Sequence, residues 1–402
     1  MAADSILIAG AGIGGLTAAL ALARYGFRVK LFDQMERLEE AGAGIQLAPN
    51  ATRVLISLGL ADRLKSGIVE PAAIRIRSGP SGRQLAALPL QDAADAGMTG
   101  RYGGPYWVIH RADLHKALTE AVAAEPGISL TLGAPVNDFT IAGDNVRATI
   151  HPRSREWTGE GHDGAILIGA DGLWSRLRAL LGDRAAPRFA GRGAFRAVVR
   201  ADHLPVQHRE PVVNVWLGRG GHVVHYPVRA GAAVNIVAVC SDRWQSVAWS
   251  TGAERDAVLR RFPPSAWTAP VRELLAAPEH WQKWALYDRP PLREWGRGPV
   301  TLLGDAAHPM LPFLAQGASM AIEDAAVLTQ ELARSPSDQV AALRRYEAAR
   351  QPRTARVQHA ARRMDFNYHV RGPAAFARDT ALRVLGGRRL LAQHDWIYRW
   401  QP

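Results

Sequence analysis

The chain has 402 residues, of which 48% are hydrophobic and 38 are glycine, so it is long enough for two domains and its composition argues against disorder. Cys240 is the only cysteine, which excludes a disulfide framework, a cysteine-based zinc site and an iron–sulfur cluster. We therefore expect a cytoplasmic protein whose redox chemistry would use an organic cofactor. The formal net charge of +12 comes mainly from scattered arginines, which predicts attraction of small anions and no nucleic-acid partner.

The first segment, residues 5–23, carries no charge, but glycines at positions 10, 12, 14 and 15 interrupt it. A strand, a turn and a helix explain these glycines better than a membrane span does. No basic stretch precedes the segment, so we expect neither a signal peptide nor a membrane partner.

The stretch SILIAGAGIGGLTAALALARYGFRVKLFDQ predicts a strand, a glycine turn, a helix and a second strand. In such a unit Gly10 permits the tight turn, Gly12 lets a pyrophosphate approach the backbone, and Gly15 lets helix and strand pack closely. The helix N-terminus offers unpaired N–H groups to phosphate. Asp33 ends the second strand, 18 residues after Gly15, where a carboxylate would accept ribose hydroxyls. Together these features predict a dinucleotide site.

The rest of the chain divides by its hydrophobic pattern. Residues 42–60, 107–122 and 165–181 each predict a loop or short strand that enters a helix. Between about 186 and 285, short alternating runs predict an antiparallel sheet inserted into the first domain. After residue 330 the pattern is mostly helical.

The run HVVHYPV, residues 222–228, is the strand with the most candidate chemistry. Strand alternation places His222 and Tyr226 on one face and His225 on the other, so the two histidines cannot form a metal pair. His110 and His115 lack a third ligand nearby in sequence, and no metal is predicted.

The stretch TLLGDAAHPMLPFLAQGASMAIEDAA, residues 301–326, predicts a strand, a loop of small residues and proline, and an amphipathic helix. Its carboxylate at the end of the strand is Asp305. The small residues around it would let the backbone approach a large flat group.

Three separated signatures resemble the single-component FAD-dependent aromatic hydroxylases, the family with the para-hydroxybenzoate hydroxylase fold. They are GAGIGG with Asp33, GADGLWSRLR (169–178), and GDAAHP followed by AQGASMAIEDA (304–325). The runs GAGIQLAPN, HYP and DWIY are most similar to the hydroxylases of 3-hydroxybenzoate, salicylate and 6-hydroxynicotinate.

The resemblance implies an α/β (α+β) fold in which a Rossmann-type FAD-binding domain carries an inserted antiparallel-sheet substrate domain and a C-terminal helical segment. The FAD-binding domain is expected at 1–75, 100–185 and 286–335, the substrate domain at 76–99 and 186–285, and the helical region at 336–402.

FAD is the cofactor that the resemblance implies, with NADH or NADPH as co-substrate. The residues expected to hold FAD are Gly10, Gly12, Gly14, Gly15, Asp33, Arg37, Arg111, Asp171, Gly304, Asp305, Pro312, Gly317 and Ala318. Arg37 would share the ribose contact with Asp33, which is an aspartate where glutamate is common. The N–H groups at Gly317 and Ala318 would meet the N1–C2 edge of the flavin, which is anionic when reduced.

The implied reaction is hydroxylation of a small aromatic acid by O2 through a flavin C4a-hydroperoxide. Leu47, His222, Tyr226 and Phe313 are expected to contact the substrate, and His222 and Tyr226 to be catalytic. Pro312 and Phe313 are apolar where related enzymes often have a polar side chain, so this loop does not define the substrate.

Two other functions stay open at this point: an FAD dehydrogenase or reductase without oxygen insertion, and a non-catalytic protein that binds flavin or nucleic acid. We expect a monomer or homodimer. The sequence does not define the ring substrate, the hydroxylated position, decarboxylation, or the choice between NADH and NADPH.

Overall fold

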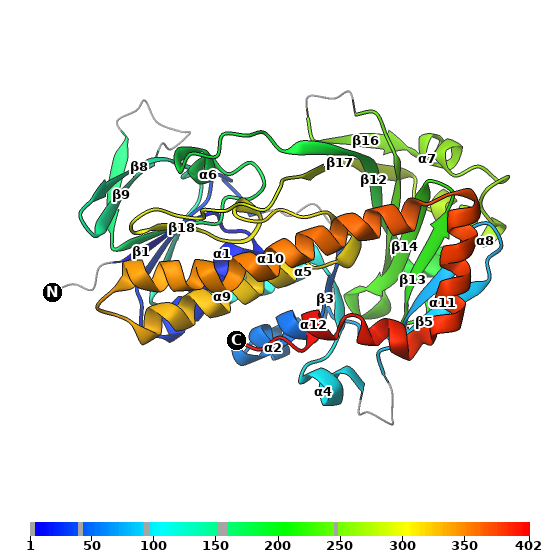
Figure 1. Cartoon of the computed structure of the whole chain (residues 1–402), viewed down its shortest axis with the longest axis horizontal. Helices are drawn as coiled ribbons and strands as arrows, with labels where there is room; N and C mark the ends of the chain where they lie inside the picture. The colour runs from blue at the N-terminus through cyan, green and yellow to red at the C-terminus, as the bar shows by residue number, and fades with distance from the viewer. Residues whose placement is uncertain (1–4, 39–42, 92–96, 151–158, 245–247) are drawn as a thin grey trace.

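Two large sheets lie at opposite ends of the long axis of the molecule (Figure 1). The computed structural model describes residues 5–38, 43–91, 97–150, 159–244 and 248–402. One sheet has five strands and the other has eight. The long helix α10 (Gln339–His369) extends from the first sheet to the second.

The five-stranded sheet is parallel, with β1 at its centre. Across the sheet its strands are β18 (Val300–Leu302), β11 (Ile166–Gly169), β1 (Ile6–Ala9), β2 (Val29–Phe32) and β7 (Ile128–Thr131). The helix α1 (Ile13–Arg24) connects β1 to β2, so the predicted βαβ unit is present. The central strands are continuous apolar runs because both faces of the sheet are covered.

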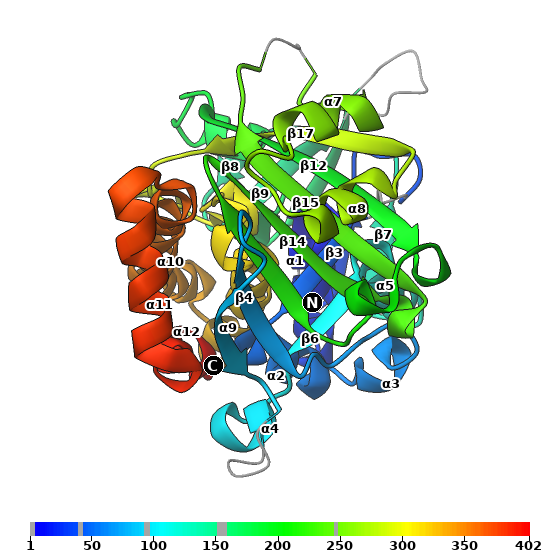
Figure 2. The same ribbon diagram turned by 90° about the vertical axis from the view of Figure 1, so that its right-hand side faces the viewer.

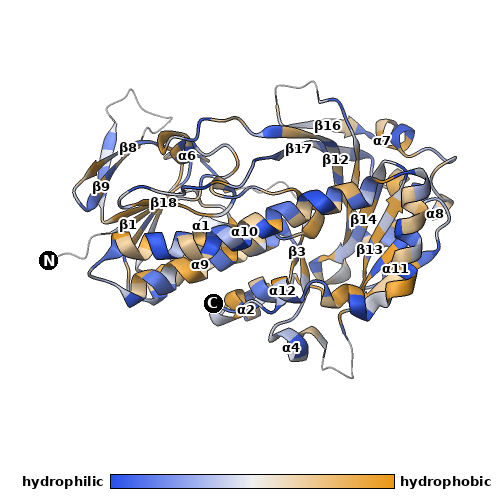
Figure 3. Ribbon diagram, viewed as in Figure 1, coloured by the Kyte–Doolittle hydropathy of each residue, from blue (hydrophilic) through white to orange (hydrophobic). Residues whose placement is uncertain are grey.

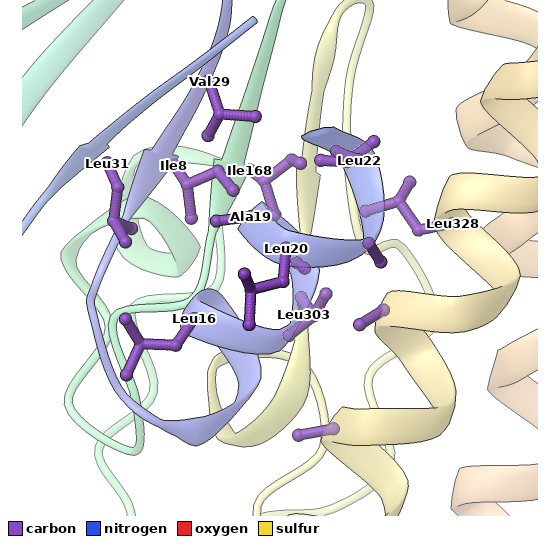
Figure 4. Close-up of a cluster of buried hydrophobic side chains, with 14 of the residues drawn as sticks. Ile8, Leu16, Ala19, Leu20, Leu22, Val29, Leu31, Ile168, Leu303 and Leu328 are labelled. Atoms are coloured by element: carbon purple, nitrogen blue, oxygen red, sulfur yellow. The ribbon is translucent and has the colours of Figure 1, made fainter. Parts of the chain in front are cut away.

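Helices cover one face of this sheet and a small antiparallel sheet packs on the other. The helices are α1, α5 (Arg111–Ala123) and α9 (Gly317–Arg334). Figure 4 shows Ala19 and Leu22 of α1 between Ile8 of β1 and Leu328 of α9. The small sheet consists of β10 (Glu160–Gly164), β9 (Asn145–Ile150) and β8 (Val136–Ala142), which share the same core.

The eight-stranded sheet forms the other end of the molecule. In order its strands are β16 (Ser250–Glu254), β17 (His280–Asp288), β12 (Arg188–Arg200), β15 (Ala233–Ser241), β14 (Gly221–Val228), β13 (Val213–Gly218), β4 (Ala73–Ser78) and β5 (Gln84–Pro89). Its outer face is covered by α7 (Arg255–Arg261) and α8 (Ala269–Ala276), as Figure 2 shows.

This sheet differs from the predicted antiparallel sheet at one pairing, because β4 and β13 are parallel. The strand β4 comes from an earlier segment of the chain and adds to the edge with its own hairpin partner β5. Both segments that we predicted to form the substrate domain therefore contribute strands to this sheet, while the exact domain boundaries stay a prediction.

The remaining elements are short connections and the C-terminal helices. They are β3 (Gly44–Leu47), which pairs with β6 (Trp107–His110), and α2 (Pro49–Ser57), α3 (Ala61–Leu64), α4 (Gly97–Tyr102), α6 (Arg176–Leu180), α11 (Gly372–Ala392) and α12 (Asp395–Tyr398). None of the helices within the described ranges has the length and apolarity to cross a bilayer.

The helix α10 joins the cores of the two ends. Its 31 residues correspond to a length of about 46 Å. Polar and apolar residues alternate along it (Figure 3). Leu343 and Tyr346 pack in the core of the five-stranded sheet, whereas Ala361 packs in a cluster that includes Val239 of β15. The last turns of α10 therefore lie against the eight-stranded sheet.

Candidate active site

A cavity of about 370 Å³ separates the two sheets. On one side it is lined by the glycine turn before α1 and by the segment from Gly304 to α9. On the other side it is lined by β12, β14 and β15, and residues 43–46, at the start of β3, complete the lining. The predicted cofactor segments and the predicted substrate strand therefore face one another across a single space.

The glycine turn has two positions that tolerate only glycine and one position that is open. Gly10 has φ +107°, and a Cβ there would lie 2.3 Å from the Ala170 carbonyl oxygen. A Cβ on Gly15 would lie 1.9 Å from the Gly10 carbonyl oxygen. A Cβ on Gly12 would meet no atom within 4 Å, and Gly12 lines the cavity at the start of α1. Gly12 thus leaves space for a ligand beside the first N–H groups of α1. Because the N-cap residue Gly12 has no side chain, no side-chain cap accepts a hydrogen bond from these N–H groups.

Asp33 joins the end of β2 to this turn. Its carboxylate accepts hydrogen bonds from the Ala11 N–H at 2.6 Å and from the Met35 N–H at 2.8 Å. A carboxylate has about four lone-pair sites, so it can still accept a ribose hydroxyl. Arg37 is exposed, and neither Asp33 nor Arg37 lines the cavity. Their predicted contacts with ribose stay predictions.

The cavity offers two half-sites for a cofactor, which we together call the cradle: the glycine turn before α1 and the segment that follows β18. This second half begins at Gly304. The strand β18 ends at Leu302, so Asp305 lies in a 3-10 turn, η5 (Gly304–Ala306), rather than at the strand end that the sequence predicts. The Asp305 side chain is accessible from the cavity, while the surrounding protein raises its pKa by desolvation. Pro312 also lines the cavity, from the 3-10 turn η6 (Pro312–Leu314).

The N-terminus of α9 is uncapped where it meets the cavity. Gln316 occupies the cap position, but its side-chain oxygen accepts the Asn50 amide at 3.0 Å instead of a helix N–H. Gly317 and Ala318 line the cavity, and the first turn of α9 has no acidic residue. Two helix N-termini without a side-chain cap, an open glycine and an accessible carboxyl group therefore meet in one cavity, which fits a cofactor with phosphate, ribityl hydroxyl and anionic ring groups.

A buried ion-pair network supports this second half. Asp324 on α9 accepts the Gly304 N–H at 3.0 Å, the His308 Nε2 at 2.5 Å and the Arg350 Nε at 2.7 Å. Burial acts to raise the pKa of Asp324, but His308 and Arg350 outweigh it and lower this pKa to about 2. The carboxylate is therefore ionised and holds the Gly304 turn in place, and Gly304 itself has φ +63°.

Two arginines face the cavity. Arg111 begins α5, directly after β6, and was expected from the resemblance. Arg196 on β12 was missed. Its Nε has no hydrogen-bond partner in the described part of the chain, and its guanidinium lies 5.6 Å from the Trp284 ring centre. In the run FRAVV, strand alternation places Arg196 on the face opposite Phe195, Ala197 and Val199, where a polar side chain is ordinary, so the sequence carries no signal for this residue.

His222 and Tyr226 lie on the cavity wall with Val224 between them, on the face that strand alternation predicts. His222 is 3% exposed, and its ring lies 5.5 Å from that of Phe313, which also lines the cavity. Burial, and then the nearby His369, lower the pKa of His222 well below its usual range. Burial raises the pKa of Tyr226, so its hydroxyl stays protonated at neutral pH.

Two predicted site residues have other surroundings. Leu47 is fully buried in the core of the five-stranded sheet and does not line the cavity, where Ile45 and Gln46 are found instead. Asp171 caps α6 by accepting the Ser175 hydroxyl at 2.6 Å and the N–H groups of the next two residues at 2.7 and 3.1 Å. Its neighbours Ala170 and Gly172 line the cavity, and a cofactor contact of the Asp171 side chain stays a prediction.

Comparisons with known proteins agree with this geometry. The model of the FAD binding domain family matches residues 4–361. The chain is 39% identical to 3-hydroxybenzoate 6-hydroxylase 1 of Aquipseudomonas alcaligenes, covering 98% of this chain and 97% of that one. It is 35% identical to 6-hydroxynicotinate 3-monooxygenase of Bordetella bronchiseptica, covering 88% and 89%. A solved salicylate hydroxylase substrate complex superposes with a TM-score of 0.82 at 28% identity, covering 99% and 96%.

Proposed function

The chain belongs to the FAD binding domain family and is an FAD-dependent monooxygenase, and we propose that it hydroxylates a small aromatic acid that carries a ring hydroxyl group, using NAD(P)H and O2. The observation that carries the proposal is the pair of His222 and Tyr226, which faces the cofactor cradle across one cavity. When bound, FAD supplies the transfer of electrons from NAD(P)H and the delivery of one oxygen atom. The protein side chains bind and orient the aromatic acid and remove the proton of its ring hydroxyl.

The proposed substrate contacts follow from charge and polarity. Arg196 and Arg111 bring positive charge to a cavity whose other walls include Val224 and Phe313, so a carboxylate on an apolar ring suits it. Tyr226 donates a hydrogen bond to a ring substituent, because its hydroxyl stays protonated. A 3-hydroxybenzoate, salicylate or 6-hydroxynicotinate type of acid, which the relatives' names contain, satisfies these contacts.

His222 is the proposed base. It is neutral at pH 7, because burial lowers its pKa, and a neutral imidazole can accept the proton of the ring hydroxyl. Removal of that proton makes the ring more nucleophilic. We also propose a cytoplasmic setting, because the chain has a single cysteine. We further propose that the protein is a monomer or homodimer and that it binds no nucleic acid.

The test is a screen of hydroxylated aromatic acids under 18O2, with NADH and NADPH oxidation followed by absorbance and products followed by mass. We expect at least one acid to stimulate oxidation and to gain one labelled oxygen atom. Replacing His222 by Ala should lower hydroxylation by roughly 10²–10⁴-fold with unchanged FAD content, because a positioned base contributes about that much. His359→Ala, an exposed histidine on α10, is the control.

Tyr226→Phe should weaken binding of the acid and increase the share of NAD(P)H that ends as peroxide, since a loosely held ring meets the oxygen donor less often. Oxidation of NAD(P)H that yields only peroxide, with every acid tested, would point to a reductase instead. Hydroxylation at the wild-type rate by the His222→Ala variant would remove His222 from the mechanism and leave the reaction class intact.

A further inference from the structure

A line of three side chains leads away from the cavity at His222. The His222 Nδ1 lies 3.0 Å from the Nε2 of His369, the last residue of α10. The His369 Nδ1 lies 2.8 Å from the Asp365 carboxylate and 2.7 Å from the Asp365 carbonyl oxygen. The side chain of Asp365 is 20% exposed, so the line begins at the cavity and ends at solvent. In Figure 1 this end of α10 lies beside β12 and β14.

The hydrogen-bond partners determine which nitrogen carries each proton. Both neighbours of the His369 Nδ1 are oxygen acceptors, so this nitrogen must carry a proton. In a neutral His369 the Nε2 then has a lone pair and can only accept, so the proton between the two rings belongs to the His222 Nδ1. The Nε2 of His222 is left with a lone pair, and no described protein group hydrogen-bonds to it.

Asp365 is held as a carboxylate. Burial acts to raise its pKa, but hydrogen bonds from His369 and from the Arg192 Nε, at 2.9 Å, lower it overall. The other titratable groups around the histidines are Tyr368, whose ring lies 5.0 Å from that of His222, and Arg192 on β12. A positive charge on His369 is therefore stabilised by an adjacent anion, whereas His222 has no carboxylate partner within the described ranges.

We propose that His369 and Asp365 are positioning residues for His222, and that His369 takes up the proton which the substrate hydroxyl loses. This proposal rests on the proposed function. The ring O–H bond breaks and a bond forms to the His222 Nε2, while the His222 Nδ1–H bond breaks and a bond forms to the His369 Nε2. The products are a phenolate in the cavity, neutral His222 and an imidazolium at His369 that faces the unchanged Asp365 carboxylate. When the product phenolate takes the proton back from the His222 Nε2, the His369 Nε2 proton returns to the His222 Nδ1, which restores the first tautomers of both rings.

The first test needs no substrate and uses the FAD-loaded enzyme with 15N-labelled histidine. The ring nitrogen shifts should show the proton of both His222 and His369 on Nδ1. In His369→Gln, His222 should lose this single tautomer. Asp379→Asn is the matched control, because Asp379 is also 20% exposed and pairs with an arginine, at 2.7 Å, but has no described contact with His222. A wild-type His222 with its proton on Nε2 would overturn the proposal.

The second test is kinetic. We expect His369→Gln and Asp365→Asn to lower kcat for hydroxylation by about tenfold or more, with a much smaller change in KM, and to shift the acid limb of the pH profile. Asp365→Glu should recover most of the rate, and Asp379→Asn should behave as wild type. FAD content and melting temperature, measured on each variant, report any loss of folding.

The outcomes separate the two hypotheses. Hydroxylation by the wild type, with unchanged kcat and pH profile in both variants, would disprove the role of His369 and Asp365 and leave the proposed function standing. A wild type that hydroxylates no aromatic acid would disprove the proposed function. In that case the tautomers of His222 in the wild type and in His369→Gln still decide whether His369 positions it.

Discussion

Arg350 offers the sharpest test of what holds the second half of the cradle. Its side chain is 1% exposed, with Nη1 at 2.6 Å from Glu323 and Nε at 2.7 Å from Asp324. Removing one partner of a buried ion pair costs about 3–5 kcal/mol, because the other charge stays buried without compensation. In Arg350→Met, however, Arg353 still pairs with Glu323 at 2.6 Å and His308 still pairs with Asp324 at 2.5 Å.

Because these partners remain, we expect the free energy of unfolding to fall by about 3 kcal/mol, the lower limit of that range. With an unfolding entropy of about 2.1 cal/mol/K per residue, 402 residues give roughly 0.8 kcal/mol/K, so the melting temperature should fall by about 4 °C. The assay is calorimetry at saturating FAD, because a bound ligand shifts the melting temperature by mass action.

The control is Arg345→Met on the same helix. Arg345 pairs with Glu331, and the Arg345 side chain is 45% exposed. An exposed pair is worth at most about 1 kcal/mol, so this variant should melt within about 1 °C of wild type. If Arg350→Met melts within the same interval as this control, the buried network does not stabilise the fold as argued.

Two further predictions concern the glycine turn and the outer face of the large sheet. Gly12→Ala should fold normally, because its φ of −72° suits alanine, but should bind FAD at least about tenfold more weakly in an absorbance titration; binding at wild-type strength would contradict this. Gly15→Ala should yield little folded protein, because its Cβ would meet the Gly10 oxygen. Burial lowers the pKa of His225 to about 3, so the unfolded state binds more protons below pH 6.5 and stability falls as pH falls toward 3. His225→Gln should reduce the loss of urea stability between pH 7 and 5 by about 2 kcal/mol, and an equal loss in both proteins would show that His225 does not titrate this way.

Features that depend on neighbouring residues were predictable from sequence. The glycine turn and its helix follow from a short fingerprint. A side chain at Gly10 or Gly15 would collide with backbone atoms next to an adjacent strand or a few residues away. Strand alternation was enough to put His222 and Tyr226 on one face, because β14 is a regular strand whose partners on both sides keep its register.

Features that depend on distant contacts were not predictable. His369 lies 147 residues from His222 and meets it only because α10 is long enough to reach the second sheet. Leu47 packs in the core and the adjacent Gln46 lines the cavity, because successive side chains of β3 point to opposite faces, and the substrate contact of Leu47 stays a prediction. The contact of Asp171 with the cofactor rests on the motif and stays a prediction, and the hydrogen bonds that its carboxylate accepts at the start of α6 were not anticipated.

The two halves of the cradle come from nearly opposite ends of the chain, since Gly12 precedes almost every other element and Gly317 follows most of them. A domain folds as a unit, and the glycine turn has no partner half-site for the cofactor until α9 has been made. FAD can therefore bind only after most of the polypeptide exists, and the bound cofactor then contacts both the first and the last parts of the domain. When flavin is scarce, newly made protein would lack this link between the two parts. We expect proteases to degrade this apoprotein faster than the FAD-loaded enzyme.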